Sequence, residues 1–245
     1  MPITFQTKTY DGNIGVFWRE DRKVLPYGFQ IKQEFADGTI IPKGTFGQIL
    51  LNDSKKFAVC KVAKVVTGGT TTKIRVQKGS LFQANDIVMK VGKLDTSPKI
   101  SSIDKSNADY DVITVNSAIT GVTAGDVLQE ATAYGYYDAE STDEGALKVV
   151  ASGATTGQIN LASVSPYNGT KELAANDYVV LKDAGTVYTP NVVVEADLKI
   201  DSANGTNTID LAHEAFVLRD RVVASEDWFD SGSFCLKLNQ NIKVL

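Results

Sequence analysis

Three residues belong to the types that most often act as nucleophiles, general bases or zinc ligands, and they lie far apart. They are the single histidine, His213, and the two cysteines, Cys60 and Cys235. A Ser-His-Asp or Cys-His centre would have to use His213, but the flanks of His213 carry no catalytic pattern and no GxSxG turn supplies a serine. Zinc ligands occur at short spacing, whereas the cysteines are 175 positions apart. The sequence predicts no catalytic residue and no zinc site.

Other chemical motifs point the same way. Neither GxGxxG nor GxxxxGK[ST] is present, so nucleotide binding lacks its usual sequence mark. Asn107 to Asp111 places oxygens at alternate positions, as calcium loops do, but the glycine and the final glutamate of such a loop are missing. A polar loop is the prediction there. A glycosidase pair could lie anywhere among the 29 acidic residues. We predict no cofactor, no metal and no enzymatic activity.

Charge and hydropathy limit the partners. The chain has 25 Lys+Arg against 29 Asp+Glu, a net charge of −4, whereas nucleic-acid binding needs clustered basic residues. No stretch approaches the roughly 20 apolar residues of a membrane helix, and residues 1–6 show no signal pattern. The expectation is a protein made in a cytoplasm, with two reduced cysteines. A single long-range disulfide is the alternative.

The elements that must carry these side chains are strands. The sequence contains 26 Val, 16 Ile and 22 Thr but only 16 Leu, and β-branched side chains favour a pleated sheet over a helix. We predict an all-β fold of short strands, sandwich or barrel-like, with little helix. One short helix is predicted from Ser225, which would cap it, and another helical turn at 169–173. Asp37-Gly38 predicts a hairpin turn.

An internal repeat organises the prediction. Each unit has a strand with a lysine, a Gly/Thr-rich turn, an Ile-x-Val/Leu strand, and an Asp that ends a turn into another strand. The lysine strands lie at 64–66, 99–100, 148–150 and 198–200, the Ile strands begin at 74, 113, 159 and 209, and the aspartates are Asp86, Asp126, Asp177 and Asp220. The alternative is ordinary β-meander patterning without true repetition.

The aromatic residues suggest a division of the chain. Seven of the 21 aromatics lie in the first 35 residues, and interface cores favour aromatic side chains. We expect an N-terminal arm with the first hairpins over residues 1–60, and a β-rich domain of about four similar units over 61–245. The expected contacts are in the arm or in the C-terminal strand: Phe5, Tyr10, Phe17, Trp18, Trp228, Phe229 and Phe234. For the arm, a strand packed on the core is the alternative.

The layout of the chain resembles a known class of proteins. The carriers of the resemblance are the segments 41–49 and 57–63, the Thr-x-Ile-x-Val…Asn-Asp-Ile-Val units, and the closing segments 217–222 and 236–242. Together they resemble head-fibre and auxiliary (decoration) capsid proteins of tailed bacteriophages of the crAss-like or Bacteroides-phage type. The resemblance implies a non-enzymatic virion protein on the capsid exterior, bound to the major capsid protein, commonly as a homotrimer. Trimer formation would also cover exposed strand edges.

Two other functions remain open. A carbohydrate-binding or adhesin domain would present exposed aromatics to a host-surface glycan, and Tyr134, Tyr136 and Tyr137 are its best feature. A lysis or tailspike enzyme is the third alternative.

Overall fold

The structure, a computed structural model, describes residues 15–25, 28–50, 53–91, 98–119, 121–132, 135–161, 173–182, 186–201, 203 and 207–245. For residues 18–21, 53–55, 135–138 and 181–182 it describes the backbone alone. The fold is all-β, as predicted, with several open sheets, none of them closed into a barrel. Within these ranges no helix reaches seven residues, and none could span a membrane.

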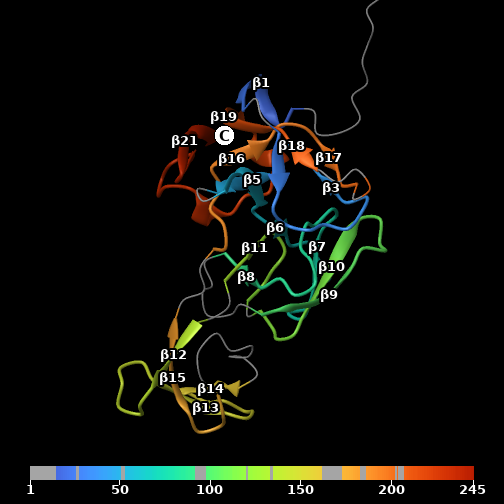
Figure 1. Cartoon of the computed structure of the whole chain (residues 1–245). Helices are drawn as coiled ribbons and strands as arrows, with labels where there is room; N and C mark the ends of the chain where they lie inside the picture. Colours follow the sequence, from blue (N-terminus) through green and yellow to red (C-terminus); the bar gives the residue numbers. More distant parts are fainter. Residues whose placement is uncertain are drawn as a thin grey trace, which may run out of the picture. The chain divides into compact units, whose positions relative to one another are not determined.

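The chain divides into two units, which we describe separately (Figure 1). The first unit is made of the described parts of Met1–Val59, Pro190–Val222 and Phe229–Leu245. The second is made of the described parts of Cys60–Thr189 and Val223–Trp228. The expected boundary near residue 60 therefore separates the units, but residues 190–222 and 229–245 join the first unit.

The largest sheet lies in the first unit and takes strands from both ends of the sequence. Its order is β18-β2-β5-β4-β16-β19-β21-β20, and β1 pairs with β19 off this path. The strands are β1 (Phe17–Val24), β2 (Phe29–Ile31), β4 (Phe46–Leu50), β5 (Asp53–Val59), β16 (Val192–Val194), β18 (Thr208–Ile209), β19 (Leu211–Val217), β20 (Cys235–Leu236) and β21 (Asn239–Val244). A separate pair joins β3 (Ile40–Ile41) to β17 (Leu198–Lys199).

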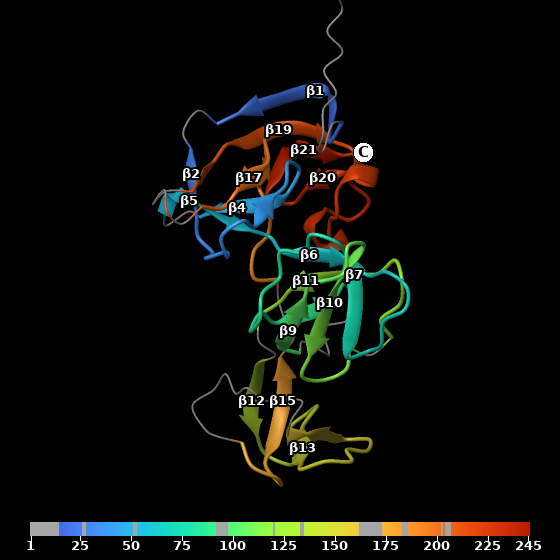
Figure 2. The same ribbon diagram turned by 90° about the vertical axis from the view of Figure 1, so that its right-hand side faces the viewer.

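The second unit holds three smaller sheets. Their orders are β7-β10-β9, β6-β11-β8 and β12-β15-β13-β14, and Figure 2 shows β9, β10 and β7 side by side. The strands are β6 (Val62–Lys64), β7 (Lys73–Gln77), β8 (Val88–Lys90), β9 (Ile100–Asp104), β10 (Tyr110–Val115), β11 (Val127–Glu130), β12 (Gly135–Ala139), β13 (Leu147–Val150), β14 (Gln158–Asn160) and β15 (Tyr178–Lys182).

Period-2 alternation accounts for the cores of this unit. β7 and β10 bury every second residue, among them Ile74, Val76 and Ile113, as expected for strands with one face on the core. These side chains form one cluster with Phe82 and Leu128. The β12–β15 sheet has a smaller cluster of its own around Val149 and Val179.

One arrangement of turn and strand recurs five times among the residues that the structure describes, and we call it the turn clasp. Each copy has a four-residue turn with a positive φ at its third residue. The N–H of this third residue donates to the carbonyl of one strand residue. The N–H of the same strand residue donates to the carbonyl of the fourth turn residue. The five turns, each with its strand residue, are 36–39 with Ile200, 42–45 with Val194, 83–86 with Ile100, 123–126 with Val65, and 174–177 with Val149.

The sequence explains why the clasp forms. Its third residues are Gly38, Gly44, Asn85, Gly125 and Asn176, the two residue types that best tolerate a positive φ. In three copies the fourth residue is an aspartate that accepts a hydrogen bond from the first residue's N–H: Asp86 from Gln83, Asp126 from Thr123, and Asp177 from Ala174. The aspartate therefore closes its own turn.

The clasps show that three of the predicted aspartate turns share one geometry, and they correct the grouping of the predicted repeat. The predicted lysine strands do face the aspartate turns, but Asp86 pairs with the strand of Lys99 and Asp126 with the strand of Lys64. The first two predicted repeat units thus exchange their aspartate turns. The predicted fourth turn at Asp220 is wrong, because residues 219–221 form a short 3₁₀ helix (η2, Arg219–Arg221).

Two local predictions also have outcomes. The Asp37-Gly38 hairpin is wrong: the turn exists, but it clasps Ile200 instead of joining two paired strands. The short helix at Ser225 is confirmed as a single 3₁₀ turn, η3 (Glu226–Trp228), in which the Asp227 N–H donates to the Ser225 hydroxyl at 3.2 Å. The helical turn expected at 169–173 lies almost wholly outside the described residues.

Candidate functional site

The aromatic residues expected at an interface have different positions in the structure. Phe17, Trp228 and Phe229 are buried, with exposed fractions of 1%, 1% and 7%. In the single chain they are core residues and offer no surface for a partner, which for Phe17 matches the alternative of a strand packed on the core. Phe234 is 66% exposed.

The remaining predicted residues are not placed in full. Phe5, Tyr10 and Tyr134 lie outside the described residues. Trp18 lies on β1, and Tyr136 and Tyr137 lie on β12, with only their backbone described. The expected Tyr cluster is therefore untested.

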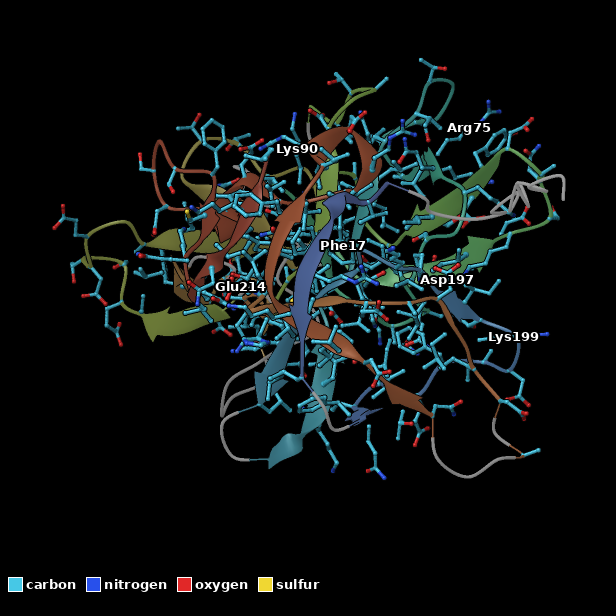
Figure 3. The ribbon with its side chains drawn as sticks, turned by 90° about the horizontal axis from the view of Figure 1, so that it is seen from above. Phe17, Arg75, Lys90, Asp197, Lys199 and Glu214 are labelled. Atoms are coloured by element: carbon cyan, nitrogen blue, oxygen red, sulfur yellow. The ribbon has the colours of Figure 1, made fainter. Side chains whose placement is uncertain are left out.

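Phe17 has a structural role in the first unit. Phe17 lies on β1 (Figure 3). Its ring lies 5.3 Å from the Arg22 guanidinium carbon and 5.1 Å from Lys43 Nζ. Arg22 also pairs with Glu195, and the nearby Lys23 pairs with Glu214 of β19 at 2.8 Å. Of these contacts, the Lys23–Glu214 ion pair joins β1 to β19, whereas the contacts with Lys43 and Glu195 join β1 to the segments that follow β3 and β16.

The C-terminal hairpin of the first unit carries exposed apolar side chains. Phe234, Leu238 and Leu245 have exposed fractions of 66%, 53% and 48%, and they lie before, between and after β20 and β21. We call them the C-terminal apolar hairpin. Exposed apolar side chains on one short hairpin are candidates for a protein contact surface.

A cluster of charged groups is buried in the second unit, on the sheet β6-β11-β8. Lys61 lies directly before β6, Asp86 is the last residue of a turn clasp before β8, and Glu130 ends the central strand β11. The Glu130 N–H donates to the Lys61 carbonyl at 3.0 Å. Strand β11 pairs with β6 on one side and with β8 on the other. Lys61, before β6, and Asp86, before β8, therefore both lie near Glu130 at the end of β11. We call Lys61, Asp86 and Glu130 the buried ion cluster.

Distances and burial define this cluster. Lys61 Nζ lies 2.8 Å from Oδ1 and 2.7 Å from Oδ2 of Asp86 and 3.3 Å from Oε1 of Glu130. The exposed fractions of the three side chains are 2%, 14% and 15%. Gln83 contacts two members of the cluster. Its backbone N–H donates to Asp86 Oδ2 at 2.7 Å, and its side-chain Oε1 accepts from Lys61 Nζ at 3.4 Å.

Glu130 is the unusual member of the cluster. Its Oε2 is buried and has no hydrogen-bond partner in the structure. Burial raises the pKa of Glu130 above its ordinary value, and the charge of Asp86 adds to the rise, while Lys61 opposes it. Burial of a carboxyl with an unpaired oxygen disfavours its charged form, so Glu130 binds a proton more readily than an exposed glutamate and is suited to acid–base chemistry.

The second unit also contains a partly exposed ion pair that corresponds to the Lys61–Asp86 pair. Lys90 Nζ lies 2.8 Å from Oδ2 of Asp126, the corresponding aspartate of another turn clasp, and their side chains are 19% and 20% exposed. Lys90 donates in addition to the Gly121 carbonyl at 2.8 Å.

A hollow of about 370 Å³ opens between two loops of the second unit. It is lined by residues 65–71, Ile74 and 122–124, which include the first predicted Gly/Thr-rich turn. The hydroxyls of Thr70 and Thr123 are already used within the loops, toward the Lys73 N–H and Asp126. The hollow therefore offers mainly backbone and methyl groups to a ligand.

The other predicted reactive residues have ordinary surroundings. Cys60 and Cys235 are both free thiols, as expected, and burial together with the Glu130 charge raises the pKa of Cys60 well above its usual value. His213 lies on β19, and its Nδ1 is buried without a hydrogen-bond partner. The polar loop predicted at 107–111 is wrong at its end, because Asp111 lies buried on β10 and accepts hydrogen bonds from the N–H groups of Gly79 and Ser80. No cluster of metal-ligating side chains occurs in the described part of the chain.

Comparison of the chain with family models, with curated proteins and with solved structures finds no match. The site therefore has to be interpreted from its own geometry. Sequence reasoning missed the buried ion cluster, although one signal was present: Lys61 interrupts the apolar segment Phe57–Ala63.

Proposed function

We propose that this chain is a structural protein of a virion, which decorates the outside of a phage capsid as a head fibre or auxiliary capsid protein. It acts without catalysis, binds the major capsid protein and assembles as a homotrimer. It is made in the cytoplasm of a bacterial host.

The C-terminal apolar hairpin is the observation that carries this proposal. It leaves Phe234, Leu238 and Leu245 exposed on the first unit, and Phe234 is one of the aromatic contacts expected from the sequence. Burying exposed apolar side chains against a partner removes them from water, which favours association. The layout resemblance to phage decoration proteins and the all-β fold support the same function.

Open sheet edges support the trimer. The nine-stranded sheet ends at β18 and at β20, and exposed edges pair with other chains unless they are covered. Association around a threefold axis would cover one edge of each subunit.

The direct test uses capsids of the phage that encodes the chain, purified from a deletion of its gene. The purified protein should sediment with these capsids and add density to their outer surface in electron micrographs. Light scattering of the free protein should give three times the 26.4 kDa of one chain. Capsids that stay bare at saturating protein would overturn the proposal. Binding on a glycan array instead would favour the carbohydrate-binding alternative.

A further inference from the structure

Lys61 and Asp86 bring together the two groups from which an amide is made, and they do so away from bulk water. Lys61 Nζ contacts both oxygens of the Asp86 carboxyl, at 2.8 Å and 2.7 Å. A nitrogen this close to both oxygens is also in van der Waals contact with Cγ, the carbon that joins them. Reacting atoms held in contact are the arrangement from which an intramolecular reaction begins.

We propose that Lys61 and Asp86 condense into an intramolecular amide bond between Nζ and Cγ, with Glu130 as the acid–base group and water as the leaving molecule. The second unit would then carry a covalent cross-link between the residue before β6 and the turn before β8. This inference is independent of capsid binding.

The reaction balances without an oxidant or a further reactant. A proton first passes from the Lys61 ammonium to Oδ1 of Asp86, which leaves a neutral amine and a neutral acid. The Nζ lone pair attacks Cγ, and the electron pair of the Cγ–Oδ2 double bond moves to Oδ2. Glu130 donates its proton to the Oδ1 hydroxyl, which departs as water, and takes a proton from Nζ as the carbonyl re-forms. One C–N bond replaces one C–O bond.

The neighbouring groups suit these steps. The Gln83 N–H donates to Asp86 Oδ2 at 2.7 Å, so it stabilises the negative charge that develops on that oxygen. The same hydrogen bond persists in the product, where Oδ2 is the amide carbonyl. Glu130 lies 3.3 Å from Nζ and keeps Oε2 without a partner, and protonated Glu130 carries the proton that the leaving hydroxyl needs.

Burial favours the product as well. Lys61 as a residue is 3% exposed, and a buried ion pair costs desolvation energy that a neutral amide does not. Fixed orientation gives intramolecular reactions effective molarities on the order of 10⁵–10⁸ M, which offsets the unfavourable loss of water in dilute solution.

The Lys90–Asp126 pair is the internal comparison. Its aspartate occupies the same place in its turn clasp, and its ammonium is as close, at 2.8 Å. However, the Lys90 side chain is 19% exposed, against 2% for Lys61, so water solvates its ammonium and lessens the desolvation that favours the amide. The bond is therefore expected at Lys61 and not at Lys90.

Mass spectrometry of the full-length protein tests the proposal without any variant. We expect the denatured chain to weigh about 18 Da less than its sequence, the mass of one water. Trypsin should release a branched peptide that joins residues 57–64 to residues 79–90, because the acylated Lys61 is no longer a cleavage site. The peptide map locates the loss independently of processing at the chain ends. Separate linear peptides 57–61, 62–64 and 79–90 at their full masses would overturn the proposal, because trypsin cleaves after an unmodified Lys61.

Variants then test the chemistry apart from folding. Glu130→Gln keeps the shape of the side chain but removes its acid, and we expect a folded protein, by circular dichroism, at full mass. Lys61→Met should also have full mass, whereas the matched Lys90→Met should still lose one water. A Glu130→Gln protein that retains the cross-link would overturn the assigned role of Glu130, and a cross-link that disappears in Lys90→Met would overturn the assignment to Lys61.

Discussion

Asp86 and Asp126 occupy the same position in two copies of one turn clasp, and each contacts a lysine ammonium, at 2.7 Å and at 2.8 Å. The two lysines differ in burial, since the Lys61 side chain is 2% exposed and the Lys90 side chain 19%. One structural unit therefore provides both a buried pair and a partly exposed pair.

The first prediction compares these two pairs. Lys61→Met leaves Asp86 as a buried carboxylate with neither the proposed amide nor a counter-ion, so we expect the free energy of unfolding to fall by about 3–5 kcal/mol or more. Lys90→Met is the matched control and should cost about 1 kcal/mol or less, because exposed ion pairs contribute little. Urea unfolding of both variants measures the difference, and equal losses would contradict it.

The second prediction concerns pH. The raised pKa of Glu130 means that the folded protein holds this proton more tightly than the unfolded chain, whose value is near 4.5. The contribution of Glu130 to stability is therefore complete below about pH 4.5 and declines as pH rises toward the folded pKa. Glu130→Gln should remove this part of the pH dependence. The slope of unfolding free energy against pH should differ between the two proteins just above pH 4.5, and identical slopes would disprove the assignment.

The contribution of Asp126 to stability should have the opposite pH dependence to that of Glu130. Burial opposes the shift, but hydrogen bonds from Lys90 and Thr123 lower the pKa of Asp126 below its ordinary 3.8. Its contribution is present above about pH 3.8 and is lost as pH falls further. Asp126→Asn should therefore lessen the acid sensitivity of unfolding, measured by fluorescence between pH 5 and pH 2. An unchanged acid transition would count against this.

The third clasp position supplies a test of backbone conformation. Asn176 has a φ of 78°, a left-handed conformation that costs most residues about 1–2 kcal/mol. Asn176→Ala should destabilise the protein by about that amount, whereas Asn176→Gly should be close to neutral. Thermal unfolding of the Asn176→Ala and Asn176→Gly proteins measures the two losses of stability. Equal losses would show that the φ of residue 176 is not the cause.

Gly47 on β4 marks a close approach in the first unit. A methyl group at this position would overlap the ring of Phe57 and the carbonyl oxygen of Ala58. We expect Gly47→Ala to cost about 1–3 kcal/mol or more, the usual range for overpacking. Adding Phe57→Leu should recover part of the loss if the ring is the obstacle, and no recovery would point to the carbonyl instead.

The proposed capsid contact can be tested with surface variants. Phe234→Ser combined with Leu238→Ser should weaken binding to capsids at least tenfold and leave the melting temperature unchanged, because both side chains are exposed. Ile40→Ser, at 55% exposure in the same unit, is the matched control and should bind normally. Sedimentation with capsids gives the affinities. Equal binding by all three proteins would exclude the C-terminal apolar hairpin as the contact.

Composition and local pattern were sufficient for the class of fold and for much of the repeat. The excess of Val, Ile and Thr predicted strands, and Asn85, Gly125 and Asn176 predicted the turns, because both signals are local. The pairing of turns with strands depends on distant contacts, so the exchange between Asp86 and Asp126 could not be predicted. The buried ion cluster was missed for the same reason: Lys61 and Glu130 are 69 positions apart, and only the sheet brings them together.

The order of the strands has a consequence for synthesis on the ribosome. β4 pairs with β16 in the finished sheet, and 142 positions separate Ile49 from its hydrogen-bond partner Asn191. At about 5–20 residues per second, β4 emerges on the order of ten seconds before the strand that covers its edge. Residues 60–189 of the second unit are translated during that interval. The edge of the nascent β4–β5 hairpin therefore stays without its partner strand while most of the second unit is made.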